Sequence, residues 1–122
     1  MKSSVKQPHL KPVPNSDKYE LTEDYNMEVG GLTIRIPKGF QYDGASIPRI
    51  FWRVIKSPFQ PKFMAPALCH DWLYTENIPG VDKSLADDIF YHLLLLNGVK
   101  KTKAKLMHQA VKWFGGGHFK KT

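Results

Sequence analysis

The chain has 122 residues, of which 42% are hydrophobic, and it carries a formal net charge of +7. This length and hydrophobic content fit one folded domain and exclude a chain that is disordered over most of its length. The single cysteine, Cys69, excludes a scaffold of internal disulfides. No apolar run is long enough to cross a membrane and residues 1–16 lack the apolar core of a signal peptide, so the sequence predicts a protein made in the cytoplasm.

The N-terminal region is rich in proline. Pro8, Pro12 and Pro14 favour an extended arm over residues 1–16 rather than a folded element. The rest of the chain is interpreted as one globular domain over residues 17–117, followed by a basic tail over residues 118–122.

A β-hairpin is predicted over residues 18–36. Leu32, Ile34 and Ile36 alternate with polar residues, which is typical of a strand with one buried face. The Gly30-Gly31 pair before them is a turn signal, so the stretch from Tyr19 to Val29 is expected to form the other half of the hairpin.

The loop after this hairpin is a candidate site. Gly44 allows close backbone approach, and Ser46 precedes a helix whose N-terminal N–H groups favour an anion, with Arg49 three residues further on. Asp43 could bind a hard cation such as Ca²⁺ together with Asp71 and loop carbonyl oxygens. The alternative is an Asp-Gly turn followed by a Ser cap.

Four helices are predicted to follow. They span residues 47–55, 63–75, 84–97 and 102–114, and Gly98 ends the third. A β-hairpin followed by a small helical bundle, with an antiparallel helix pair at its centre, gives the expected fold class, α+β. The buried side of the last helix is predicted from its apolar spacing to consist of Leu106, Met107, Ala110, Val111 and Phe114.

The predicted helix 63–75 contains the strongest functional signal. His70, Asp71 and Tyr74 share one face of this helix, because residues three and four apart lie on the same side. Almost the whole circumference of the helix is otherwise apolar, so the helix is expected to be buried. A buried His or Asp must be hydrogen-bonded, metal-bound or directed into a pocket, because an unpaired buried charge costs several kcal/mol.

A partner for His70 is expected on the next helix, where Asp87 and Asp88 stand in an otherwise apolar stretch. Helices joined by a short connection such as Pro79-Gly80 tend to pack antiparallel, which brings His70 near the start of helix 84–97. A carboxylate there would hold one imidazole nitrogen and leave the other to take a proton from water.

Structural interpretations of the same residues stay open. Ser84 and Asp87 have the spacing of a capping box, in which Asp87 would only cap its own helix. His70 could equally be a core histidine whose hydrogen bonds are satisfied. Cys69 diverges from its neighbour His70 around the helix, so it is interpreted as a buried structural thiol rather than a nucleophile.

The positive charge is concentrated at the C-terminal end. Residues 1–88 carry eleven Lys and Arg against eleven Asp and Glu, whereas residues 89–122 carry seven Lys and no acid. Lys103, Lys105 and Lys112 are therefore candidate contacts for nucleic acid or for an anionic lipid surface. The alternative is a solvated helix face, since Arg, the better ligand for phosphate, is absent there.

Several motifs occur in order along the chain, namely Asp43-Gly-Ala-Ser-Ile-Pro-Arg49, His70-Asp-Trp-Leu-Tyr74 and Ala86-Asp87. Together they resemble a family of short proteins of unknown function from tailed bacteriophages and prophages, over residues 30–116. The resemblance implies synthesis in the cytoplasm of the bacterial host, incorporation into the virion and other virion proteins as partners.

A more distant similarity is to phospholipase A2, especially the compact forms in parvovirus capsids. Position by position, it implies that His70 is the base that activates water and that Tyr74 and Asp87 orient it. It also implies that Asp71 binds Ca²⁺. The disulfides of the secreted enzymes are absent, and residues 43–46 are the only candidate for the glycine-rich calcium loop. The similarity therefore supports the helix pair better than the calcium site.

Two functions follow as hypotheses. The first is a small phage hydrolase of phospholipase-A2-like architecture, in which His70 and Asp87 activate water and Ca²⁺ is the cofactor. The second is a non-catalytic virion component of the tail, neck or baseplate, in which the same residues are structural. Nucleic-acid binding by the C-terminal lysines is a third and less favoured function.

Overall fold

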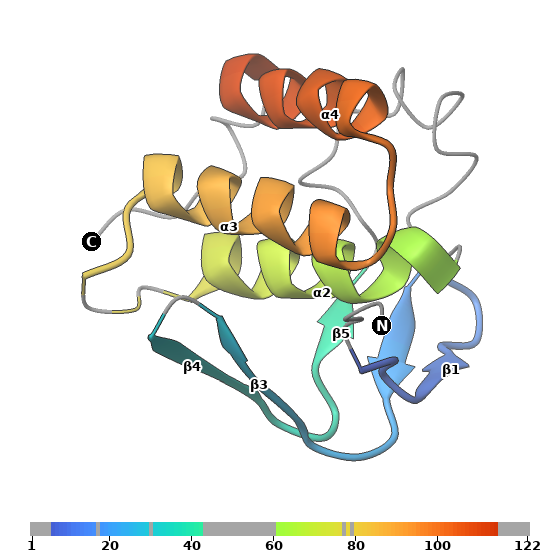
Figure 1. Ribbon diagram of the computed structural model, residues 1–122. Coiled ribbons are helices and arrows are strands. Elements are labelled where there is room, and N and C mark those ends of the chain that lie inside the picture. Colours follow the sequence, from blue (N-terminus) through green and yellow to red (C-terminus); the bar gives the residue numbers. More distant parts are fainter. Residues whose placement is uncertain are drawn as a thin grey trace.

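The structure is a computed structural model, which describes residues 6–16, 18–29, 31–42, 61–76, 78 and 80–114. Two small antiparallel sheets come first in this part of the chain and three helices follow, so the predicted α+β class is confirmed (Figure 1). The strands are β1 (Leu10–Pro12), β2 (Tyr19–Leu21), β3 (Tyr25–Val29), β4 (Leu32–Ile36) and β5 (Gln41–Tyr42). The helices are α2 (Pro61–Thr75), α3 (Lys83–Leu96) and α4 (Lys101–Phe114).

The predicted hairpin is confirmed for β3 and β4, which pair antiparallel with Val29 opposite Leu32 at the turn. Gly31 has a φ of +80°, a left-handed conformation that tight hairpin turns use and that glycine adopts at little cost. The expectation that Tyr19 belongs to the same hairpin is wrong. A bend at residues 22–23 separates β2 from β3, and β2 pairs with β1 and β5 in a separate sheet of order β1-β2-β5.

Part of the predicted N-terminal arm is integrated into this sheet. β1 lies within the predicted arm and pairs antiparallel with β2 at the edge of the sheet. Pro12 is tolerated there because an edge strand has one side on which no N–H is required. The Tyr25 hydroxyl also donates a hydrogen bond to the Lys6 carbonyl oxygen, so residues 6–12 are tied to the domain.

The three helices pack in alternating directions. At one end of the α2–α3 pair, Asn97 Nδ2 donates to the Lys62 carbonyl oxygen at 2.9 Å, and at the other end Tyr74 donates to Asp87. The predicted antiparallel helix pair is therefore confirmed. Figure 1 shows α4 on the far side of α3 from the strands, which makes it the outermost helix.

The ends of α3 follow ordinary capping chemistry, although one residue differs from expectation. The Asp82 side chain accepts a hydrogen bond from the Leu85 N–H at 2.9 Å and caps the helix. The alternative of a capping box between Ser84 and Asp87 is therefore wrong. Gly98 follows the helix with a φ of +87°, which confirms its predicted role at the C-terminus.

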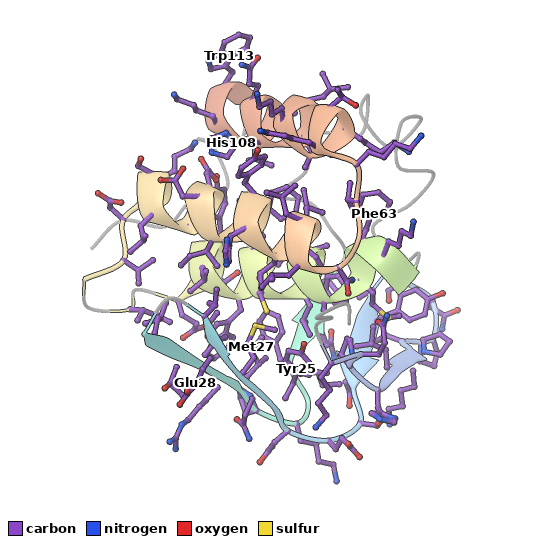
Figure 2. The ribbon with its side chains drawn as sticks, viewed as in Figure 1. Tyr25, Met27, Glu28, Phe63, His108 and Trp113 are labelled. Atoms are coloured by element: carbon purple, nitrogen blue, oxygen red, sulfur yellow. The ribbon has the colours of Figure 1, made fainter. Side chains whose placement is uncertain are left out.

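Helix α2 is at the centre of the core, as its apolar circumference predicts. It contacts α3 as well as β4 and β5, and Figure 2 shows Tyr25 and Met27 of β3 directed toward it while Glu28 points away. The predicted buried side of α4 is confirmed for Met107, Ala110 and Val111. It is wrong for Leu106, which is 43% exposed because α4 has no helix on its outer side in the described part of the chain.

Candidate functional site

A buried hydrogen-bonded group joins α2 to α3. His70 Nε2 lies 2.8 Å from Asp87 Oδ1, and the Tyr74 hydroxyl donates a hydrogen bond to the same carboxylate oxygen. His70, Tyr74 and Asp87 are each 1% exposed. His70 and Tyr74 are one helical turn apart on α2, so both side chains reach the same point on α3. The hypothesis that an acid of the next helix meets His70 is thus confirmed for Asp87.

Lys83 completes the group from one turn before Asp87 on α3. Its Nζ lies 2.8 Å from Asp87 Oδ2, whereas His70 contacts the other carboxylate oxygen, Oδ1. The same ammonium donates to the carbonyl oxygens of Val111 at 3.1 Å and Lys112 at 3.0 Å. These carbonyls belong to the last turn of α4, where a cation is favoured by the helix dipole. Lys83 therefore connects the Asp87 carboxylate to the end of the outermost helix.

The protonation states of these groups follow from burial and from their hydrogen bonds. Burial lowers the pKa of His70 below its usual range, and the Asp87 carboxylate offsets this only in part. Burial alone would raise the pKa of Asp87, but hydrogen bonds from His70, Lys83 and Tyr74 keep that pKa below its ordinary value. Burial, with the neighbouring carboxylate, raises the pKa of the Tyr74 hydroxyl. Near neutral pH the group therefore contains a neutral imidazole, an ionised carboxylate and a protonated phenol.

This arrangement fixes the tautomer of the imidazole. An ionised carboxylate can only accept hydrogen bonds, so the nitrogen that faces Asp87 must carry a proton. Nε2 of His70 is therefore the donor, and Nδ1 has the basic lone pair. A histidine held in this way can take up a proton at Nδ1 while Asp87 stabilises the charge that forms on the ring.

The other two candidate acids are Asp88 on α3 and Asp71 on α2. Asp88 is exposed on α3, and its Oδ1 lies 2.9 Å from Nε2 of His108 on α4. Asp71 is 7% exposed; burial raises the pKa of both Tyr42 and Tyr74, and the charge of Asp71 adds a smaller increase to each. Asp71 therefore lies close enough to influence the site.

The remaining predicted site residues fall into two sets. Lys105 and Lys112 are exposed on α4 and Lys103 is half-buried there. The predicted helix 47–55 lies outside the described residues, as do the loop candidates Asp43, Gly44, Ser46 and Arg49.

Cys69 is buried in the core beside Met27, with 3.9 Å between the two sulfur atoms. Burial raises the pKa of its thiol to about 12. The thiolate needed for nucleophilic chemistry is therefore scarce at neutral pH, which agrees with the interpretation of Cys69 as a structural thiol.

Comparison with known proteins assigns the chain to a family, and the matched region includes the residues of this site. Residues 19–111 match a family described as "Protein of unknown function (DUF1353)". The chain belongs to the DUF1353 family. The matched range contains His70, Tyr74, Lys83 and Asp87, so the site lies within the DUF1353 region.

Two proteins of Sinorhizobium fredii (strain NBRC 101917 / NGR234) are similar to this chain. "Uncharacterized protein y4jT" is 33% identical over 98 residues, which cover 80% of this chain and 29% of the relative. "Uncharacterized protein y4iH" is 30% identical over 89 residues, which cover 73% of this chain and 36% of the relative. The chain thus spans less than half the length of either relative. No solved structure matches the chain.

Sequence reasoning missed Lys83, although part of the signal was present. Lys83 and Asp87 have the i,i+4 spacing of a helical ion pair, which could have been noted. Its backbone acceptors at Val111 and Lys112 could not be predicted, because they depend on how α4 packs against α3.

Within the described residues, no helix has the length and apolar character needed to cross a membrane. No group of three potential His, Cys, Asp or Glu metal ligands is found in that part of the chain.

Proposed function

We propose that this DUF1353 protein is a small hydrolase of ester bonds, in which His70 activates water and Asp87 orients it. The supporting observation is the 2.8 Å contact between His70 Nε2 and Asp87 Oδ1 inside an apolar core. Three donors converge on the Asp87 carboxylate, which keeps it ionised and fixed in position beside His70. We further propose that the protein originates from a bacteriophage or prophage, on the basis of its motif pattern.

In the proposed reaction, Nδ1 of His70 accepts a proton from water while the water oxygen attacks the carbonyl carbon of an ester. The Asp87 carboxylate stabilises the imidazolium through Nε2–H, and Tyr74 and Lys83 hold the carboxylate in place. When the acyl–oxygen bond breaks, the imidazolium returns its proton to the leaving alkoxide. The products are a carboxylic acid and an alcohol.

We include Ca²⁺ in the proposal, with Asp71 and Asp43 as carboxylate ligands that would polarise the ester carbonyl. Asp71 is mostly buried and its charge acts on the site, which supports this assignment. The described residues contain no group of three potential His, Cys, Asp or Glu metal ligands, and the proposal takes its further ligands from the loop around Asp43.

The test is hydrolysis of p-nitrophenyl butyrate and of dispersed phosphatidylglycerol, with Ca²⁺ or with a chelator. We expect His70→Gln to reduce kcat by a factor of about 10²–10⁴ while the protein stays folded. His92→Gln is the matched control, since His92 is an exposed histidine on α3, and it should retain activity. Asp71→Asn should remove the dependence on Ca²⁺. A wild-type protein that hydrolyses neither substrate under any of these conditions would contradict the proposal.

A second function is favoured by the burial of the same group. The side chains of His70 and Asp87 are 0% and 2% exposed, which suits a hydrogen-bonded support inside a non-catalytic virion component. In that case His70→Gln would lower the melting temperature and the wild type would copurify with virions without any esterase activity. The two functions therefore differ in both measurements.

A further inference from the structure

The outer face of α4 exposes large apolar side chains. Trp113 is 67% exposed and Leu106 is 43% exposed. The two residues are seven positions apart, so they lie on the same side of the helix. Figure 2 shows Trp113 projecting from α4 on the side away from α3. The two exposed apolar side chains lie about two turns, or roughly 10 Å, apart along the helix, and we call them the Leu106–Trp113 strip.

Lysines border this strip, and α4 contains no acid. Lys101, Lys105 and Lys112 are exposed on α4. The opposite side of the helix is fixed in the core through Met107 and Val111, which are both fully buried. The strip and its lysines are therefore held on one rigid surface.

A hollow of about 530 Å³ adjoins the strip between α4 and α3. From α4 it is lined by Trp113 of the strip and by polar side chains, of which Lys105, Gln109 and Lys112 can donate hydrogen bonds. Asp88 also lines the hollow, but its carboxylate is paired with His108 at 2.9 Å. These donors suit the phosphate of a lipid headgroup that lies beside the strip.

We propose that α4 binds the surface of an anionic phospholipid membrane, with Trp113 and Leu106 entering the interface and Lys105 and Lys112 contacting headgroup phosphates. Helices that lie at a membrane surface combine Trp and Leu on one side with Lys on the other, and tryptophan is favoured at headgroup depth. The charge is complementary, because a lysine near an anionic leaflet contributes about 1 kcal/mol. The inference rests on the proposed hydrolase, because membrane binding would identify aggregated anionic phospholipid as the substrate of that enzyme.

Nucleic acid fits the same surface less well. Double-stranded or single-stranded nucleic acid would contact the lysines, and a base could stack on Trp113. Neither would gain from contact with an exposed aliphatic side chain such as Leu106. The membrane interface uses all of these residues. Lys83 also connects the end of this helix to Asp87, so the proposed surface and the His70 site are joined by one side chain.

The experiment is cosedimentation of the full chain, as the inactive His70→Gln protein, with vesicles of phosphatidylcholine alone or with phosphatidylglycerol added. We expect binding to the anionic vesicles only, and binding that weakens as salt rises. Lys105→Gln with Lys112→Gln should weaken binding by about 25-fold, since about 1 kcal/mol per lysine is about fivefold. Trp113→Ala should weaken binding on the order of tenfold through lost apolar contact.

The matched control is Lys18→Gln with Lys38→Gln, which removes the same charge from exposed lysines on the strand side of the molecule. It should bind anionic vesicles nearly as well as its parent. Equal losses in both double variants would overturn the proposal, as would binding to duplex DNA but not to vesicles. Wild-type hydrolysis of soluble p-nitrophenyl butyrate without vesicle binding would overturn this inference and leave the proposed hydrolase standing. Vesicle binding without any hydrolysis would support the membrane-binding surface and contradict the proposed hydrolase.

Discussion

Lys83 Nζ lies 2.8 Å from Asp87 Oδ2, and the same ammonium is hydrogen-bonded to the last carbonyl groups of α4. One lysine therefore neutralises the buried carboxylate of the His70 site and also caps the outermost helix. The Lys83 side chain is only 25% exposed, so water replaces these contacts poorly if the ammonium is removed.

We expect Lys83→Met to lower the free energy of unfolding by about 1–3 kcal/mol, because Asp87 and the α4 carbonyls each lose a donor. Urea denaturation followed by circular dichroism measures this. Lys100→Met, at an exposed lysine just before α4, is the control and should change stability by less than about 0.5 kcal/mol. Equal stabilities of the two variants would show that the Lys83 contacts contribute nothing.

Stability should fall as the pH falls from about 7 toward 5. The pKa of His70 is lower in the folded state than its ordinary value of about 6.5. When the pH falls below this ordinary pKa, His70 binds a proton in the unfolded chain but stays neutral in the folded chain, so protonation favours unfolding. The lowered pKa of Asp87 adds a further loss below about pH 4 by the same reasoning. Urea midpoints at several pH values measure the effect.

The variant His70→Gln should flatten the part of this pH dependence that lies between pH 7 and 5, since glutamine does not titrate. A wild-type midpoint that rises as the medium is acidified over this range would contradict the assigned direction.

Phe90 and Leu106 should differ strongly in their contribution to stability. Phe90 is 1% exposed and its ring lies 4.7 Å from the His70 ring, centroid to centroid. We expect Phe90→Ala to cost about 3–5 kcal/mol through lost burial and a cavity. Leu106→Ala should cost less than about 1 kcal/mol, because that side chain is 43% exposed. Thermal and chemical denaturation of both variants would reveal whether the order is instead reversed.

Cys69 should be unreactive in the folded protein. Its thiol is fully buried and its pKa is raised to about 12, so a thiol reagent at pH 8 meets little thiolate and no open path. We expect labelling by Ellman's reagent only after unfolding in urea, with one thiol per chain. Cys69→Ala should also retain any esterase activity. Fast labelling of the native protein would show that the thiol is accessible.

The candidate site could be predicted in part because its signals are local. The spacing of His70 and Tyr74 places them on one helical face. The apolar residues around them predict that the helix is buried, and a buried histidine needs a polar partner. The sequence also named Asp87 and Asp88 together. It could not choose between them, because adjacent residues point about 100° apart and the rotation of α3 against α2 decides which one faces inward.

The sequence by itself determined the β3–β4 hairpin, the three described helices and the set of polar residues that had to find partners in the core. These features depend on periodicity and turn chemistry within short stretches of chain. Only the tertiary structure decided that β2 pairs with β1 and β5, that Asp87 rather than Asp88 meets His70, and that Lys83 reaches the end of α4. The physical reason is that such contacts join residues far apart in the chain, and their geometry is set by how whole helices and strands pack.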